Sequence, residues 1–289
     1  MSTPRLRQMG LIGLGLLGSA LAERLLGAGW QIVGFDVDAE RRRRLDELGG
    51  QPLGSAREVV RQCHGTLLLS LPDSRVVEHV VGEVDGELTP PLTIIDTTTG
   101  DPRSSETLAA RLAQRGIDYL DATVAGSSEQ ARAGEVLLMV GGRDEPFSAC
   151  EALFATFAQG VFHVGPSGSG ARMKLVVNLA LGLNRAVLAE ALALAGKCGI
   201  DAALALEVLK QSPAYSRAMD IKGEKMIRRD FEPAARLSQH LKDVRLILEL
   251  GRQCEAKLPL SELHRRLLEE VEAAGLGAAD NSAIIQAFD

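Results

Sequence analysis

The spacing of hydrophobic and polar residues changes once along the chain, near residue 165. Before that point, short apolar runs alternate with segments whose apolar residues recur at helical spacing. Short apolar runs between helices are typical of strands buried in a parallel sheet and joined by right-handed crossovers. The expected strands are Met9–Gly13, Gln31–Phe35, Thr66–Leu71, Leu92–Ile95, Ile117–Leu120, Val136–Val140 and Val161–Val164. The pattern therefore predicts an α/β fold with a doubly wound parallel sheet.

After residue 165 the strand pattern stops and the spacing is helical. The expected helices are Ala171–Ala195, Ala202–Gln211, Ser212–Ile227, Leu237–Cys254 and Ser261–Ala274. The chain has 289 residues, and single hydrophobic cores rarely grow beyond about 250 residues. We therefore expect two domains: an α/β domain over residues 1–164, and an all-helical domain over residues 165–289 that begins with a long helix.

That long helix carries two unusual polar residues. Its apolar residues lie on every side, so we expect the helix to be buried between domains or between subunits. Lys174 and Asn178 interrupt this pattern and are four residues apart, which places both on one helical face. Lysine is rarely buried without a partner or a function. The pair is a candidate functional site, although Lys174 could instead extend to solvent while Asn178 caps a neighbouring loop.

A glycine-rich motif lies between the first expected strand and the helix after it. Its residues are Gly13, Leu14, Gly15, Leu16, Leu17 and Gly18, and the second strand ends at Asp36, eighteen residues after Gly18. Gly13 allows a tight turn, Gly15 lets a pyrophosphate approach the backbone, and Gly18 lets helix and strand pack closely. The N-terminus of the helix offers N–H groups to the phosphate. Residues 1–164 are thus predicted to be a dinucleotide-binding Rossmann domain.

Asp36 also bears on which dinucleotide is bound. A carboxylate at this position accepts hydrogen bonds from both adenosine ribose hydroxyls and repels a 2′-phosphate. We therefore favour NAD over NADP. The arginine run Arg41–Arg44 could bind a 2′-phosphate, but a solvated helix face is the simpler interpretation of these residues.

Ligands of doubly wound sheets bind beyond the carboxyl ends of the strands. Three segments fall there: Leu71-Pro72, Asp96–Thr99 and Asp121–Ser128. Within the last, Ser127 and Gln130 have the spacing of a capping box and follow Gly126. A helix N-terminus of this kind suits a substrate carboxylate, although a plain helix cap is an equally good interpretation.

Charge and cysteine usage exclude several classes of function. The net charge of −6 and the pI of about 5.5 argue against general affinity for nucleic acid or anionic membranes. Four scattered cysteines, with no histidine at ligand spacing, argue against disulfides or a metal and favour a reducing cytoplasm. The segment Met1–Gln8 is short and charged, and the apolar run after it contains glycines, so we expect neither a signal peptide nor a membrane span.

Several motifs together resemble those of the β-hydroxyacid dehydrogenases, the group that contains 3-hydroxyisobutyrate dehydrogenase, tartronate semialdehyde reductase and glyoxylate/succinic semialdehyde reductase. The resemblance covers nearly the whole chain. The motifs are Gly13–Gly18, Asp96–Thr99, Asp121–Ser127 with Gly134, Gly165–Asn178, Lys242-Asp243 and Gly275–Ser282. The segment Gly165–Asn178 is the most specific of them.

This resemblance implies roles for individual residues. Lys174 would be the catalytic lysine, with Asn178 helping to hold the substrate. Lys242 would reach the cofactor, and Thr99 and Leu71-Pro72 would line the nicotinamide. It also implies a homodimer or homotetramer and a small carboxylate-bearing substrate, whereas the charge of the chain predicts no nucleic-acid or membrane partner.

The loop Ala125-Gly126-Ser127 would hold the substrate carboxylate, but this chain has Ala125 where the family usually has a serine. The expected function is reversible NAD(P)-dependent oxidation of a small 3-hydroxy acid to its semialdehyde or keto acid. Two alternatives stay open. One is imine reduction on the same scaffold, against which Lys174 counts, and the other is a non-catalytic nucleotide-sensing protein.

Overall fold

The computed structural model describes residues 8–289 and forms two compact units, the first ending at Lys174 and the second comprising Leu175–Asp289. The division falls inside helix α8 (Ser169–Lys197), whereas the sequence analysis places the junction after residue 164. The prediction made for Met1–Gln8 concerns residues that lie, except for Gln8, outside the described range.

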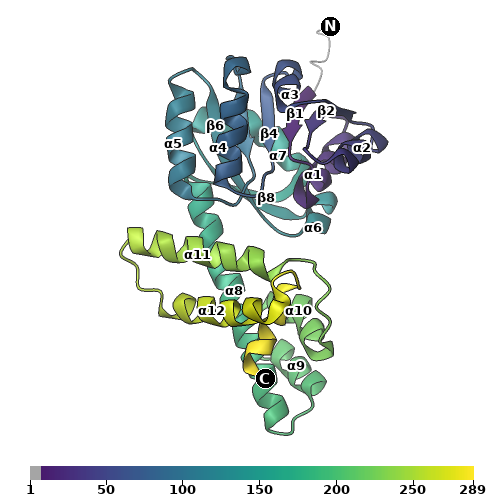
Figure 1. Cartoon of the computed structure of the whole chain (residues 1–289), viewed down its shortest axis with the longest axis vertical. Helices are drawn as coiled ribbons and strands as arrows, with labels where there is room; N and C mark the ends of the chain where they lie inside the picture. The colour runs from purple at the N-terminus through teal and green to yellow at the C-terminus, as the bar shows by residue number, and fades with distance from the viewer. Residues whose placement is uncertain (1–7) are drawn as a thin grey trace. The chain divides into compact units, whose positions relative to one another are not determined.

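The first unit contains an eight-stranded sheet (Figure 1). Its strands lie in the order β3-β2-β1-β4-β5-β6-β7-β8. Their bounds are β1 Gln8–Ile12, β2 Gln31–Phe35, β3 Gln51–Pro52, β4 Thr66–Leu69, β5 Thr93–Asp96, β6 Asp118–Ala125, β7 Val136–Gly141 and β8 Ala158–Gly165. From β1 the chain adds β2 and β3 on one side and then β4, β5 and β6 on the other. This reversal of strand order at β1 is typical of a doubly wound sheet. The predicted fold class is confirmed.

One strand runs against the prediction of an all-parallel sheet. β7 pairs antiparallel with β6, and every other neighbouring pair is parallel. Only a short helix, α6 (Ser128–Ala133), and a left-handed turn at Gly134 connect β6 to β7. This connection is too short for a parallel crossover, which needs about a dozen residues or more. The chain therefore returns antiparallel.

Helices cover both faces of the sheet and bury most of it, although Leu137 of β7 and Phe162 of β8 stay exposed. They are α1 Leu16–Gly27, α2 Ala39–Glu47, α3 Ala56–Gln62, α4 Ser74–Glu83, α5 Pro102–Ala113, α6 and α7 Asp144–Phe157. Met9 and Leu11 of β1 enter the hydrophobic core beside α1 and α7, while Ile12 enters the core beside α3, α4 and α5. Opposite faces of one strand thus carry two separate cores, as the alternation of side chains requires.

The second unit is helical, as expected. After α8 come α9 Ala202–Gln211, α10 Arg217–Arg228, α11 Leu237–Gln253 and α12 Pro259–Val271, followed by a π-helical turn over Glu272–Leu276 and a 3-10 segment over Asn281–Phe288. Helix α10 begins later than predicted because the Ser212 hydroxyl accepts a hydrogen bond from the Ala214 amide and holds a turn there. The hydrophobic core of the second unit includes Leu188, Leu241, Val244 and Leu268.

Helix α8 is only partly enclosed within the single chain. Large apolar side chains on it stay exposed in the single chain, namely those of Met173, Val176, Leu181, Val187 and Leu194. By length and hydropathy alone this helix could cross a membrane, but long core helices of soluble proteins meet the same criterion. Hydrophobic residues all round the helix do not ensure burial within one chain.

Candidate active site

The glycine motif forms a tight loop from β1 to α1, and its three glycines meet different requirements. Gly13 has a φ of 94°, and a Cβ there would lie 2.2 Å from the carbonyl oxygen of Ser70. A Cβ on Gly18 would lie 2.0 Å from the carbonyl oxygen of Gly13. At Gly15 the nearest neighbour of such a Cβ is Arg41 Nη1, at 3.9 Å. Packing therefore requires glycine at the first and third positions, while the middle position has the open space that a pyrophosphate needs.

The beginning of α1 is also suited to a phosphate. Gly15 is its N-cap, and among the described residues no side chain caps the helix. The first N–H groups of α1 are therefore available to a phosphate. Leu14 is buried beneath the loop and Leu16 is 76% exposed. The residues present thus fit the dinucleotide that the motif predicts.

Asp36 joins this loop to the end of β2. Its Oδ2 accepts a hydrogen bond of 2.7 Å from the Leu14 amide, and its Oδ1 one of 2.9 Å from the Asp38 amide. Arg41 Nη1 lies 3.3 Å from the same Oδ2. Arg42 donates to the backbone oxygens of Asp36 and Val37. Arg41, Arg43 and Arg44 are exposed and Arg42 is half-buried, so the run is solvated, as the simpler interpretation expects, while Arg41 and Arg42 also contact the Asp36 segment.

The ends of β4 and β5 lie beside the glycine loop. The Leu71 amide donates to Thr98 Oγ1 at 3.1 Å, and the Leu71 side chain lies 3.1 Å from the position of a Cβ on Gly13. Pro72 is exposed and Thr99 is half-buried at the same sheet edge. Strands β1, β4 and β5 are consecutive in the sheet. The predicted nicotinamide-side residues Leu71, Pro72 and Thr99 therefore lie at strand ends next to the glycine motif.

The predicted capping box is present after β6. Gln130 N donates to Ser127 Oγ at 3.2 Å, and Ser127 N donates to Gln130 Oε1 at 2.9 Å. Gly126 is required by packing because its φ is 154° and a Cβ would lie 2.7 Å from Val136. Ala125 ends β6 opposite Leu137. The Ser127 amide is thus already bonded, so an anion at this loop would use other donors.

The strand β6 also holds the beginning of α8. Asp121 accepts hydrogen bonds from the amides of Gly168 (2.7 Å) and Ala171 (2.9 Å), and the Thr123 hydroxyl donates to the Gly170 carbonyl at 2.9 Å. Lys174, which is half-buried, follows within the same first turns of the helix. Burial raises the pKa of Asp121 to about 6, although the two amides lower it.

In the second unit, the predicted site residues Asn178 and Lys242 both contact Asp243. Asn178 Nδ2 donates to Asp243 Oδ2 at 2.9 Å, and Lys242 Nζ lies 3.5 Å from Asp243 Oδ1. Asp243 is 8% exposed. The family resemblance includes Asp243 in a motif with Lys242 but implies a role only for Lys242. The position of Asp243 between the apolar residues Leu241 and Val244 was the sequence feature that could have predicted its burial.

Asp121 is a second residue whose partners no local sequence pattern indicates. It lies inside an apolar strand, where an acid must find hydrogen-bond donors. Fourteen of the sixteen predicted site residues belong to the first unit, and Asn178 and Lys242 belong to the second. Within residues 8–289, no group of three histidine, cysteine or acidic residues could hold a metal ion.

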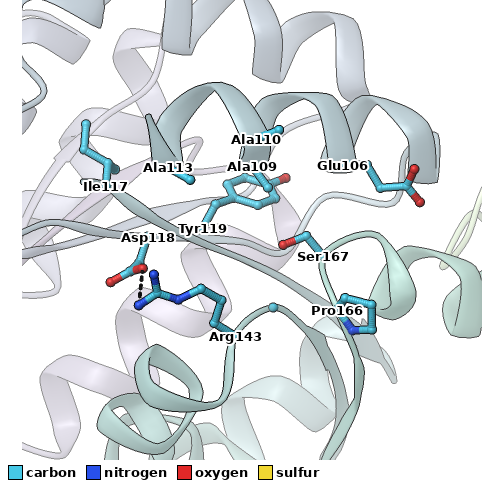
Figure 2. Close-up of a pocket in the computed structure, with 11 residues that line it drawn as sticks. Glu106, Ala109, Ala110, Ala113, Ile117, Asp118, Tyr119, Arg143, Pro166 and Ser167 are labelled. Carbon is cyan, nitrogen blue, oxygen red and sulfur yellow. Dashed lines mark ion pairs between the residues drawn. The ribbon is translucent and has the colours of Figure 1, made fainter. Parts of the chain in front are cut away.

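A hollow of about 400 Å³ lies on the first unit and contains none of the predicted site residues. Figure 2 shows its wall of small α5 side chains, with Arg143 paired to Asp118 on the opposite side. The N···O distance of this pair is 3.4 Å. Pro166 and Ser167, which precede α8, complete the lining. The hollow therefore borders the turn that leads into α8 without including Lys174.

Comparison with known proteins agrees with this geometry. Residues 8–165 match the family described as the NAD binding domain of 6-phosphogluconate dehydrogenase. Residues 168–288 match the family described as NAD-binding of NADP-dependent 3-hydroxyisobutyrate dehydrogenase. Together the two matches cover nearly all of the described chain.

Individual relatives match over nearly their full length. The chain is 33% identical over 286 residues to 2-(hydroxymethyl)glutarate dehydrogenase of Eubacterium barkeri, covering 98% of this chain and 95% of that protein. It is 30% identical to L-threonate dehydrogenase of Cupriavidus necator, covering 98% and 96%. The crystal structure of 3-hydroxyisobutyrate dehydrogenase from Salmonella typhimurium superposes with a TM-score of 0.89 at 25% identity, covering 96% of this chain and 99% of that one. The chain therefore belongs to the NAD(P)-dependent β-hydroxyacid dehydrogenase family.

Proposed function

We propose that this protein reversibly oxidises a small 3-hydroxy acid to its semialdehyde or keto acid, with Lys174 as general acid and base. The observation that carries the proposal is the attachment of the first turn of α8 to β6, in the same sheet that bears the dinucleotide loop. This attachment sets Lys174 at the beginning of a helix, within the unit that fits the cofactor.

The proton chemistry belongs to the protein and the hydride to the cofactor. Bound NAD(P) supplies or accepts the hydride. In reduction, the Lys174 ammonium stabilises the negative charge that develops on the carbonyl oxygen and donates a proton to it. In oxidation, the neutral amine accepts the hydroxyl proton. Asn178 helps to orient the substrate, and its hydrogen bond to Asp243 fixes the orientation of its amide.

The substrate carboxylate binds at the loop Ala125-Gly126-Ser127, where the beginning of α6 favours a negative charge. Ala125 supplies no hydroxyl, so the side chain of a preferred substrate differs from that of relatives with serine at this position. The role of Lys242 toward the cofactor stays a prediction from the family resemblance.

The cofactor preference follows from Asp36 and Arg41 together. Asp36 favours the two ribose hydroxyls of NAD, and Arg41, in contact with that carboxylate, provides a cation toward a 2′-phosphate. We propose that NAD is preferred and that Arg41 permits measurable use of NADP.

A second copy of the chain is the proposed partner. The exposed apolar side chains of α8 form the kind of surface that association covers, and a homodimer or homotetramer in the cytoplasm is the simplest form. Sedimentation of the purified protein measures this assembly directly.

An oxidation assay with both cofactors tests the function. The panel contains 3-hydroxyisobutyrate, glycerate, 4-hydroxybutyrate and serine, together with 2-(hydroxymethyl)glutarate and L-threonate. A separate reduction assay supplies NAD(P)H and a cyclic imine. Consumption of NAD(P)H with the imine, together with no oxidation of any hydroxy acid, would support imine reduction instead. Cofactor binding without any turnover would support the nucleotide-sensing alternative.

Lys174→Ala tests the catalytic assignment. Loss of a general acid–base group lowers kcat by about 10²- to 10⁴-fold, while the dissociation constant for NAD(P)H, measured by fluorescence, stays unchanged. Lys197→Ala is the matched control, because Lys197 is exposed at the other end of the same helix. Near-normal turnover of Lys174→Ala would reject the assignment.

A further inference from the structure

We propose that Asp121 is a positioning residue for Lys174: its carboxylate fixes the turn before α8 and the first turn of that helix, and so sets where the lysine amine lies. The inference rests on the proposed role of Lys174 and adds a residue that acts through it.

The geometry gives each carboxylate oxygen one backbone partner. Oδ1 accepts from the Gly168 amide at 2.7 Å, and Oδ2 accepts from the Ala171 amide at 2.9 Å. The first N–H groups of a helix have no partner within the helix. In most N-caps the acceptor is a neighbouring residue, but Asp121 is 47 and 50 residues away in the chain. The orientation of α8 at its origin is thus set by the sheet.

Close packing makes this arrangement rigid. A Cβ on Gly170 would lie 2.2 Å from the Asp121 carbonyl oxygen, and one on Gly141 would lie 2.6 Å from Asp121 Oδ1. Thr123, two residues along β6, donates to the Gly170 carbonyl at 2.9 Å. The beginning of α8 therefore lies directly against the backbones of β6 and β7 and has no room to shift toward them.

Lys174 is only three residues beyond the bonded Ala171 amide. A small rotation of this first turn would move the amine relative to the sheet edge that fits the cofactor. A misplacement of about 1 Å can reduce a catalytic rate by about 100-fold. The two hydrogen bonds of Asp121 are therefore expected to matter for kcat more than for cofactor affinity.

Charge makes the attachment sensitive to pH. Burial and, to a smaller extent, the charge of Asp96 on β5 raise the pKa of Asp121 to about 6, against the lowering effect of the two amides. Tyr119 on β6, which donates to Asp96 at 2.7 Å, also interacts with the charge of Asp121. Glu106 on α5 lies beside Gly168 and forms an ion pair with Arg172 of α8. As the pH falls through about 6, one oxygen takes up a proton and becomes a poor acceptor. The first turn of α8 is then held less firmly and kcat declines.

The test is Asp121→Asn in the full-length protein. The asparagine amide has one oxygen for two N–H donors, so its NH₂ group faces one of them. We expect kcat at neutral pH to fall by about 10- to 100-fold, the decline of kcat near pH 6 to disappear, and the NAD(P)H dissociation constant to stay within about twofold. Amide hydrogen exchange should accelerate in peptides spanning residues 165–175.

Asp101→Asn is the matched control. Asp101 caps α5 in the same unit by accepting a hydrogen bond from the Arg103 amide, and asparagine is an equally good N-cap. We expect the control to keep the kcat, the pH profile and the exchange of residues 165–175.

If Asp121→Asn does not fold, Thr123→Val replaces it. That variant loses the bond to the Gly170 carbonyl, and we expect a several-fold lower kcat with the acidic decline intact. Unchanged kcat and unchanged exchange in whichever variant folds would overturn the positioning role. Normal turnover in Lys174→Ala would instead reject the proposed function, whereas the exchange measurement needs no turnover, so the two failures are distinguishable.

Discussion

Two buried carboxylates, one in each unit, show how different partners produce different behaviour. Asp121 accepts two backbone amides and no cation among the described residues. Asp280 accepts the amides of Ala234, Ala235 and Ser282 and also two hydrogen bonds from Lys222 Nζ, at 2.7 and 2.9 Å. Both are nearly inaccessible to solvent.

Their pKa values move in opposite directions. Burial raises the pKa of Asp121 to about 6, against the effect of its amides. Burial also acts to raise the pKa of Asp280, but the Lys222 ammonium and the amides lower it to about 2. Backbone amides alone thus satisfy a buried carboxylate without keeping it ionised at mildly acidic pH, whereas one buried cation does. Asp121 can respond to pH near the proposed catalytic site, while Asp280 is a constant part of the helical unit.

The largest expected effect comes from removing the cation. Lys222→Met leaves Asp280 buried without its cation, and breaking a buried ion pair costs about 3–5 kcal/mol in the free energy of unfolding. Urea denaturation monitored by circular dichroism measures the loss. The matched control is Lys225→Met on the same helix, a half-buried lysine that bonds the Glu232 carbonyl. A loss no larger than the control's would contradict the importance of this pair.

The buried histidine His264 shows the effect of burial on a basic side chain. Burial, and then the charge of Arg185, lower the pKa of His264 to about 4 from 6.5. A lowered folded-state pKa means that the stabilisation is present above pH 6.5 and is lost as the pH falls toward 4. This loss amounts to at most about 3 kcal/mol.

His264→Gln should therefore weaken the dependence of unfolding free energy on pH between 7 and 4. His79→Gln, on the exposed surface of α4, should leave that dependence unchanged. Parallel pH dependences for the wild type and His264→Gln would show that this histidine does not contribute.

Asp36 is intermediate between Asp121 and Asp280, because its cation partner is partly exposed. Substitutions at this pair have the smallest expected effect of those considered. It accepts two amides and contacts Arg41, a guanidinium that is half-exposed. Exposed ion pairs contribute up to about 1 kcal/mol. Arg41→Ala should therefore lower the ratio of kcat/KM for NADP over NAD by about fivefold, and Asp36→Ala should raise it. Arg43→Ala, which removes an exposed arginine paired with Glu40, is the control. Unchanged ratios would reject the cofactor argument.

The features that local sequence patterns predicted correctly are those that depend on neighbours along the chain. The alternation of strands and helices, the glycine loop before α1 and the Ser127–Gln130 capping box were all predicted, because the spacing of apolar residues and the chemistry of turns act over a few residues. The same reasoning predicted that Lys174 and Asn178 share one helical face, while their functional roles stay predictions.

The features that only the tertiary structure decided depend on partners far apart in the chain. The Asp121–Ala171 bond spans 50 residues and the Asn178–Asp243 bond spans 65. The antiparallel direction of β7 depended on the length of the connection through α6, and the contact of Arg41 with Asp36 depended on where α2 packs. An apolar pattern specifies which side of an element is buried, but the polar partner that a buried side chain meets there is selected by packing, which no local pattern encodes.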